Sequence, residues 1–176
     1  MQVKVFKVSN GKIKNRCYLI YRGRNGLLID PAWDYELINR FLVEHNIRLS
    51  GILLTHSHRD HTDLAARFSA SKGVQVMMSA KEIEASGFSL PNLVSLYHHH
   101  KVQTTIFQIL PIVTPGHTLG STCYLIGQHL FTGDTVFTEG VGLCTKENAP
   151  LLFQSVQRLK ETIAPETKVW PGHSYG

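Results

Sequence analysis

Three histidines and one aspartate lie within six residues of each other, directly after the apolar run at residues 51–54, in the segment T-H-S-H-R-D-H. Side chains two positions apart point the same way on an extended chain, so His56 and His58 can converge on one point. Asp60 and His61 follow on the turn into a helix and can face a second point. Imidazole and carboxylate groups are ligands for borderline divalent metals such as zinc. The segment therefore predicts a metal-dependent enzyme and suggests two metal ions rather than one.

Three further segments place a ligand-type residue where a predicted strand ends. The segment I-V-T-P-G-H-T-L-G offers His117, F-T-G-D-T-V-F offers Asp134, and V-W-P-G-H-S-Y offers His173. A Pro-Gly pair before a histidine makes a tight turn, so the imidazole can project from the strand end into a cleft. Gly133 lets the backbone come close to whatever the carboxylate of Asp134 binds.

Together these residues form a complete set of ligands for two metal ions. Counting candidates gives His56, His58 and His117 for one ion, Asp60, His61 and His173 for a second, and Asp134 as a bridge, although spacing alone does not show which residues converge. Two ions about 3.5–4 Å apart can share a hydroxide and lower its pKa from ~15.7 toward ~7. Such a hydroxide attacks a carbonyl. We predict a centre with two Zn²⁺ ions, where Fe or Mn could replace either, and with Asp60 and Asp134 as catalytic carboxylates.

The composition indicates one globular domain over residues 1–176. Apolar residues make up 43% of the chain and charged residues 18%, which fits a chain with a hydrophobic core and not a disordered one. No apolar run approaches the length of a membrane span, and the start lacks the apolar block of a signal peptide, so we expect no membrane association. Three cysteines without C-x-x-C spacing indicate free thiols and a cytoplasmic location.

The net charge of +5 mildly favours anionic partners. A phosphopantetheine arm on an acidic acyl carrier protein, a coenzyme A ester or a glutathione ester would fit this charge. The basic residues are scattered rather than gathered in a run, so we expect no binding to nucleic acid.

The hydrophobic pattern predicts runs of strands with helices between them. Strands are expected at residues 3–8, 17–22, 26–29, 51–54, 74–78, 103–109, 110–114, 122–126, 129–132 and 168–170. Helices are expected at 34–46, 62–71, 79–85 and 151–163, and residues 86–101 are expected to be irregular. This order fits sheets covered by helices, with the ligands at strand ends or in the loops just after them.

The ligand segments, in this order and spacing, resemble the metallo-β-lactamase superfamily, and most closely its glyoxalase II-like branch of thioester hydrolases. The resemblance is carried by T-H-S-H-R-D-H, P-G-H-T-x-G-S, F-T-G-D-T-x-F and P-G-H-S-Y, and it covers essentially the whole chain. It implies an α/β fold, namely an αββα four-layer sandwich of two mixed sheets flanked by helices, with a dinuclear site at one edge. It also implies the division of ligands given above, and the segment I-D-P-A places Asp30 near the metals as a supporting residue.

The resemblance further implies hydrolysis of an acyl thioester. Full glyoxalase II has a helical C-terminal domain that helps to bind glutathione, whereas this sequence ends three residues after His173, so we expect that a C-terminal helix or substrate domain is missing from it. The segment after Asp134 only loosely resembles the glutathione enzymes, so lactoylglutathione is not favoured. The chain looks like the stand-alone hydrolases that accompany bacterial polyketide synthases.

Other activities stay open as alternatives. Persulfide dioxygenases resemble this fold and hold one iron, for which His56, His117 and Asp134 would be the ligands here, but the intact second set of ligands argues against this reaction. Lactone hydrolysis could use the same hydroxide, and a module that only presents metal to a partner would show no turnover. β-Lactam cleavage is disfavoured because the most similar lactamases have a cysteine at a second-site position, where this chain has Asp134.

Several other polar residues are candidates for lesser roles. The adjacent residues His98, His99 and His100 are expected in a solvated loop, because three neighbouring side chains on an extended chain cannot all face one way. Cys144 could lie near the site without acting as a nucleophile, and Tyr175 could donate a hydrogen bond to the reacting carbonyl or pack. Arg59, Glu139 and Lys146 are candidates for contact with the substrate.

Overall fold

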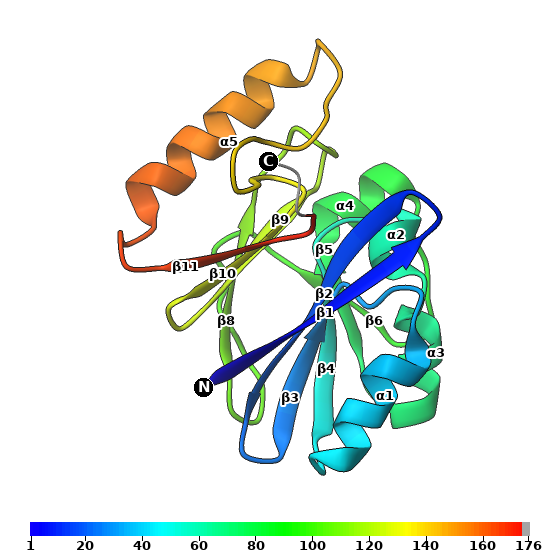
Figure 1. Cartoon of the computed structure of the whole chain (residues 1–176). Helices are drawn as coiled ribbons and strands as arrows, with labels where there is room; N and C mark the ends of the chain where they lie inside the picture. The colour runs from blue at the N-terminus through cyan, green and yellow to red at the C-terminus, as the bar shows by residue number, and fades with distance from the viewer. Residues whose placement is uncertain (174–176) are drawn as a thin grey trace.

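Two β-sheets pack face to face, and helices cover both outer faces of the pair, as the computed structural model shows (Figure 1). The structure describes residues 1–173. One sheet contains, in spatial order, β1 (Gln2–Asn10), β2 (Ile13–Arg22), β3 (Asn25–Ile29), β4 (Arg48–Leu54), β5 (Val76–Ser79) and β6 (Leu93–Leu96). The other contains β11 (Lys168–Pro171), β10 (His129–Gly133), β9 (Thr122–Ile126), β8 (Gln108–Val113) and β7 (Val102–Gln103).

Both sheets are mixed. Strands β1 to β3 pair in antiparallel fashion and β3 to β6 pair in parallel. Strands β7 to β10 are antiparallel, and β11 adds to β10 in parallel. The helices are α1 (Tyr35–Glu44), α2 (Arg59–Thr62), α3 (Ala65–Lys72), α4 (Ala80–Ser86) and α5 (Ala149–Thr162). This arrangement confirms the predicted αββα sandwich.

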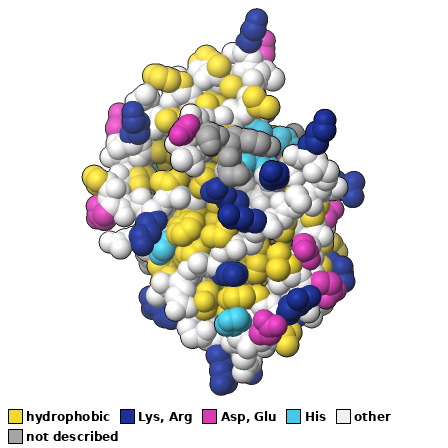
Figure 2. All heavy atoms as spheres, viewed as in Figure 1, with side chains coloured by type: hydrophobic (Ala, Val, Ile, Leu, Met, Phe, Trp, Pro, Cys, Tyr) yellow, Lys and Arg dark blue, Asp and Glu magenta, His cyan; other side chains and the backbone are white. Residues whose placement is uncertain are grey.

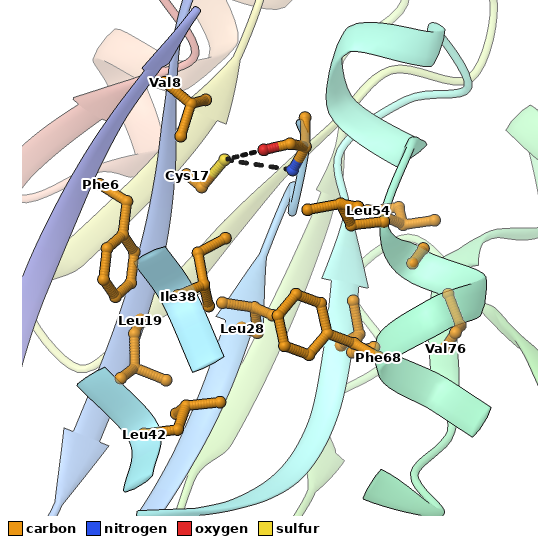
Figure 3. Packing of buried hydrophobic residues seen from close by; sticks show 14 of the residues in the cluster. Phe6, Val8, Cys17, Leu19, Leu28, Ile38, Leu42, Leu54, Phe68 and Val76 are labelled. Carbon is orange, nitrogen blue, oxygen red and sulfur yellow. Dashed lines mark hydrogen bonds between the residues drawn. The ribbon is translucent and has the colours of Figure 1, made fainter. Parts of the chain in front are cut away.

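Three buried clusters fill the three spaces between the four layers. Phe68 of α3 packs with Leu28 in the cluster between the helices and the first sheet, which Figure 3 shows from close by. Tyr124 belongs to the cluster between the two sheets. Leu159 of α5 packs with Leu130 on the outer face of the second sheet. Each interface removes apolar surface from water, which is the main stabilising contribution in such a sandwich.

Strand β4 shows how the sequence produces this layering. Ile52 and Leu54 belong to the cluster under the helices, whereas Leu53 belongs to the cluster between the sheets. Successive side chains of a strand point to opposite faces. Because both faces of this sheet are covered, the strand ends as a continuous apolar run rather than as an alternating one.

The pairing directions bring the predicted ligand loops to one edge. Strands β8, β10 and β11 run the same way, so the loops that follow them lie together. The end of β4 joins that edge, because Thr122 donates its backbone N–H to Thr55 O at 2.9 Å and the Tyr124 hydroxyl donates to Leu54 O at 2.7 Å. These two bonds tie the sheets together beside the loop that carries His56.

Capping residues determine where two of the helices begin. Asp34 Oδ1 accepts the backbone N–H of Leu37 at the start of α1, and Ser79 Oγ accepts the backbone N–H of Glu82 at the start of α4. Such caps satisfy backbone donors that lack a partner in the first helical turn. None of the helices within residues 1–173 is both long and apolar enough to cross a membrane.

The helix predicted over residues 62–71 is confirmed from Ala65 onward, but its predicted start was wrong. The helical segment begins earlier, as α2 at Arg59, and α3 starts separately at Ala65. The chain changes direction between them because Leu64 donates its backbone N–H to Pro31 O at 3.0 Å instead of continuing the helix. Periodicity could not reveal this bond, which joins residues far apart in the sequence.

The prediction that residues 86–101 are irregular was also wrong, because they contain β6. This short edge strand pairs in parallel with β5 and follows Asn92, whose φ of 61° turns the chain. Asparagine tolerates this left-handed conformation better than most residues. Four residues at a sheet edge give too short a pattern for recognition from sequence alone.

The strands expected at residues 103–109 and 110–114 have different boundaries. A tight turn closes between Thr104 and Phe107, since the N–H of Thr104 donates to Phe107 O at 2.8 Å. The hairpin arms are the short β7 and the single longer β8. The predicted break near residue 110 therefore lies inside a strand.

The three cysteines should differ sharply in reactivity. Burial raises the pKa of Cys17 to about 12 and that of Cys123 to about 11, whereas Cys144 is exposed. Only the thiolate reacts with disulfide reagents. We expect an aromatic disulfide to titrate one thiol per native chain and three after denaturation, measured by absorbance. A native count above one would contradict the packing of Cys17 and Cys123.

Candidate metal centre

Three imidazoles face one another beyond the end of β4. His56 and His58 follow that strand, and His117 lies in the loop after β8. Nδ1 of His58 lies 3.1 Å from Nε2 of His56 and 3.0 Å from Nε2 of His117. Three ring nitrogens that converge in this way suit a tetrahedral ion with a fourth position left for water or substrate.

A second group of three residues lies beside the first. Nε2 of His61 is 3.3 Å from Nε2 of His173. Asp60 Oδ2 is 3.6 Å from the His61 nitrogen and 3.4 Å from the His173 nitrogen. Helix α2 supplies Asp60 and His61, and the turn after β11 supplies His173. This group could hold a second ion through two nitrogens and one carboxylate.

The carboxylate of Asp134 lies between the two groups. Its Oδ1 is 3.3 Å from Nε2 of His61. Its Oδ2 is 3.2 Å from Nε2 of His173 and 3.7 Å from Nε2 of His117. The structure thus brings together all seven residues that the sequence analysis selected as ligands, and it places Asp134 within reach of both groups.

Hydrogen bonds on the outward ring nitrogens direct the inward lone pairs toward the centre. His61 Nδ1 donates to Asp30 Oδ2 at 2.9 Å, and His56 Nδ1 donates to Thr55 Oγ1 at 3.1 Å. The Thr55 hydroxyl in turn donates to Asp30 Oδ2 at 2.6 Å. Such partners fix the tautomer of a ligating imidazole and increase its basicity. Asp30 therefore occupies the supporting position that the resemblance implied.

Backbone carbonyls orient two more of the imidazoles. His117 Nδ1 donates to Leu143 O at 2.6 Å, and His173 Nδ1 donates to Lys14 O at 2.8 Å. In both rings Nε2 is left to face the centre. The segments that carry Lys14 and Leu143 are distant in sequence from the histidines they hold, so local sequence could not predict these bonds.

The two groups of imidazoles carry different charge. Burial lowers the pKa of His56 well below its usual value, and the neighbouring His61 adds to this effect. Burial alone would also lower the pKa values of His61 and His173, but Asp134 together with Asp30 or Asp60 raises each to about 10. A cation must therefore compete with protons at the second group, whereas His56 offers a neutral ring.

The two aspartates of the centre stay ionised. Burial would raise the pKa of Asp60, but its contacts with His173, His61 and Asn15 together outweigh burial and lower the value to about 2. His173 and His61 likewise outweigh burial at Asp134 and hold its pKa well below the usual range. Both carboxylates can therefore act as anionic ligands at neutral pH.

The donor set fits a divalent metal. Asp134 Oδ1 is buried and accepts no hydrogen bond within residues 1–173. A buried ionised oxygen without such a partner is costly unless a cation neutralises it. Imidazole nitrogens and carboxylate oxygens are the ligands that zinc and related metals take in proteins, so the residues present suit such ions.

A cavity of about 830 Å³ opens from this centre. Five of the predicted ligands line its inner end: His58, Asp60, His117, Asp134 and His173. Its remaining wall is largely apolar and comes from Ile13 on the β1–β2 hairpin and from the loop at residues 137–145, which includes Phe137, Val141 and Leu143. The Leu143 side chain is 88% exposed at this wall, which is unusual for a large apolar residue unless something binds there.

The loop at residues 137–145 is fastened to the centre through its backbone. A Cβ atom on Gly142 would lie 1.8 Å from Asp134 O and 3.2 Å from His117 Nδ1. Only glycine allows this close approach. The next residue, Leu143, supplies the carbonyl that holds His117. The position of this loop therefore fixes the His117 ring.

The family model of the metallo-β-lactamase superfamily matches residues 13–173. The chain belongs to this superfamily. The crystal structure of TTHA1623 in a di-iron-bound form has a TM-score of 0.78 at 28% identity, covering 98% of this chain and 93% of that one. The fold and the ligand-bearing edge therefore agree with the resemblance found in the sequence.

Two relatives of this superfamily member have names that give different activities. The probable polyketide biosynthesis zinc-dependent hydrolase BaeB of Bacillus velezensis is 41% identical over 99% of this chain and 80% of its own length. A hydroxyacylglutathione hydrolase of Pseudoalteromonas translucida is 33% identical over 90% of this chain and 60% of its own length.

The lesser candidates from the sequence lie in different places. His98, His99 and His100 are exposed and do not line the cavity, as the solvated-loop prediction required, and His98 Nδ1 accepts the backbone N–H of Val113. Cys144 and Glu139 do line the cavity, whereas Lys146 and Arg59 do not, and Arg59 pairs with Asp63 at 3.3 Å. Tyr175 lies outside the described residues.

Glu82 is a supporting residue that the sequence analysis missed. This carboxylate is buried, and it accepts the backbone N–H of Ser57 at 2.9 Å, the hydroxyl of Thr118 at 2.7 Å and the backbone N–H of Gly120 at 3.0 Å. It therefore joins the loop of His56 and His58 to the loop of His117. A glutamate in the first turn of an amphipathic helix gives no sequence signal of such a role.

Asn15 is a second missed residue, on strand β2. Its Nδ2 donates to the backbone oxygen of Asp60 and lies 3.3 Å from Asp60 Oδ2. The residue is buried although it is polar. These contacts hold the start of α2 against the first sheet and fix the direction of the Asp60 carboxylate.

Replacing Glu82 by glutamine should weaken metal binding at the first group. The amide N–H₂ would face backbone N–H or hydroxyl donors, so one of the two loops loses its acceptor. We expect zinc affinity to fall by about 10–100-fold, the usual cost of losing a supporting partner, measured by competition with a chromophoric chelator. Glu84→Gln, on the exposed face of the same helix, is the control. A lower melting temperature with unchanged zinc affinity would show that Glu82 only stabilises the fold.

Proposed function

We propose that this superfamily member is a zinc-dependent hydrolase that cleaves acyl thioesters. The observation that carries the proposal is the position of Asp134 between two groups of ligands at the inner end of a largely apolar cavity. The printed names of its relatives, a zinc-dependent hydrolase of polyketide biosynthesis and a hydroxyacylglutathione hydrolase, support the same class of reaction.

The donor set assigns each residue a part in the reaction. His56, His58 and His117 would hold one ion, Asp60, His61 and His173 a second, and Asp134 would reach both. Zinc in such a site would lower the pKa of a coordinated water, so that a hydroxide is present at neutral pH and can attack a carbonyl. Asp60 is half-buried at the cavity and held by Asn15, so its carboxylate can orient the attacking water.

A thioester suits the groups that line the cavity. Its leaving group is a thiolate, which departs with little help from a general acid because of its low pKa. Four of the five histidines of the centre, all except His58, use their outward nitrogens for fixed hydrogen bonds, so they are poorly placed to donate protons to a leaving group. An amine leaving group would need such a proton.

The cavity wall favours an apolar acyl group. Ile13, Val141 and Leu143 would contact the acyl chain while its carbonyl lies at the ligands. Burial of apolar groups gives about 25 cal/mol per Å². We propose acyl groups of the kind carried by an acyl carrier protein, coenzyme A or glutathione, with an acidic carrier protein as the partner for the positively charged chain.

Metal analysis separates the leading reaction from the main alternative. A persulfide dioxygenase would contain about one iron per chain, held by His56, His117 and Asp134, whereas the hydrolase would contain about two zinc ions. The contacts of His61 and His173 with Asp60 and Asp134 favour the hydrolase. Lactone hydrolysis remains an alternative substrate class for the same centre.

The decisive variant is Asp134→Asn, which keeps the shape of the side chain and removes its charge. We expect kcat/KM for an acyl-N-acetylcysteamine thioester to fall at least about 100-fold in zinc-loaded protein, because the carboxylate lies within reach of both ligand groups. Thiol release measures the reaction, and circular dichroism checks the fold. Equal turnover by the variant and the unchanged protein would refute the proposal.

The contribution of Leu143 can be measured with acyl chains of different length. Leu143→Ala should lower kcat/KM about tenfold for an octanoyl thioester and much less for an acetyl thioester, since only the longer chain loses apolar contact. The backbone carbonyl that holds His117 is kept, so bound zinc should not change. Leu37→Ala on α1 is the matched control. An equal loss with both substrates would contradict an acyl-binding role.

A further inference from the structure

A second hollow lies on the β1–β2 hairpin, next to the metal centre. It has a volume of about 410 Å³ and is lined by Lys7, Val8, Ser9, Lys14, Asn15 and Arg16. No carboxylate within the described chain lines it. Figure 2 shows several Lys and Arg side chains in the middle of the viewed face, beside histidine side chains.

The strand register explains why three cations meet there. Lys7 lies opposite Arg16, and Ser9 lies opposite Lys14. Directly opposed residues and residues two apart share one face of a hairpin. Lys7, Lys14 and Arg16 therefore project from the same face, and Lys7 and Lys14 are exposed.

The groove shares its strand with the supports of the centre. Asn15 lies 3.3 Å from Asp60 Oδ2, Lys14 O accepts from His173 Nδ1, and the backbone N–H of Arg16 donates to Gly172 O at 2.8 Å. Ile13, on the same strand, lines the apolar cavity. Ile13 and Asn15 alternate with Lys14 and Arg16 and so project from the other face of β2. A molecule whose reacting atom sits at the ligands therefore reaches the groove by passing around the edge of β2 at residues 13–15, which do not pair with β3.

The positive charge of the groove is not neutralised by acidic side chains. None of the ion pairs among residues 1–173 involves Lys7, Lys14 or Arg16. Uncompensated cations in a concave surface attract anions and raise their local concentration. Their position beside a reaction centre indicates a part in substrate binding.

We infer that this groove binds the phosphate end of a phosphopantetheine arm, which is the thiol half of the thioester. The inference rests on the proposed function. The phosphate has one negative charge and two free oxygens when it joins the arm to a carrier protein, and up to two charges and three free oxygens in 4′-phosphopantetheine itself. Both forms can bind ammonium and guanidinium groups. The acyl chain then lies in the apolar cavity, the thioester at the ligands and the pantetheine arm around the edge of β2.

The test compares two thioesters that differ only in the phosphate. An acyl-pantetheine and the same acyl-4′-phosphopantetheine are given to zinc-loaded protein. We expect kcat/KM to be about tenfold higher for the phosphorylated substrate at low salt, and the ratio to fall toward one in Lys7→Glu and in high salt. Lys4→Glu, on the opposite face of the same strand, should keep the ratio.

Acyl-coenzyme A and an acyl carrier protein distinguish the two sources of the phosphate. A similar loss with both substrates in Lys7→Glu supports recognition of the phosphate itself. A loss confined to the carrier protein, or to acyl-glutathione, overturns the inference. So does a phosphorylation ratio near one that Lys7→Glu leaves unchanged.

The experiment distinguishes failure of the thioester proposal from failure of the groove inference. If neither pantetheine thioester is hydrolysed, the thioester proposal is refuted, and the groove is tested by calorimetric titration with 4′-phosphopantetheine and pantetheine. Preferential binding of the phosphorylated compound, weakened in Lys7→Glu, supports the groove. Equal binding of both compounds overturns it.

Discussion

The carboxylate of Asp30 is the interaction on which the ligand-bearing edge depends. Oδ1 accepts the backbone N–H of Thr55 at 2.8 Å, and Oδ2 accepts the Thr55 hydroxyl and His61 Nδ1. One buried group thus joins the ends of β3 and β4 to helix α2. Asp30 adopts a φ of 49° to do so, a conformation that aspartate tolerates better than most residues. Through Thr55 it reaches His56 as well, so both groups of ligands depend on it.

The centre also depends on how the two sheets pack. The first half of the chain supplies His56, His58, Asp60 and His61, and the second half supplies His117, Asp134 and His173. Neither half holds a complete set, and Thr122 and Tyr124 join the halves beside the ligands by donating to Thr55 and Leu54. Folding must therefore bring the sheets together before the ligands converge, and metal binding adds its free energy to that packed state.

The sequence predicted the ligand types and the layered fold because both leave local patterns. T-H-S-H-R-D-H is contiguous, and apolar runs mark the buried strands. Glu82 and Asn15 could not be found in this way, since their contacts join residues 25 to 45 positions apart and no local pattern marks a buried polar side chain. The edge strand β6 and the break before Leu64 were missed for a related reason, because pairing and a distant carbonyl determine them.

The backbone and the side chain of Leu143 have different roles. The carbonyl of Leu143 holds His117, and Gly142 fixes that backbone against Asp134. Leu143 also lines the cavity, and its side chain is exposed there. Substitution of the side chain at this position can therefore change substrate selectivity and leave the metal ligands in place. A fold built this way can diversify its substrates through single exposed positions, without passing through inactive ancestors.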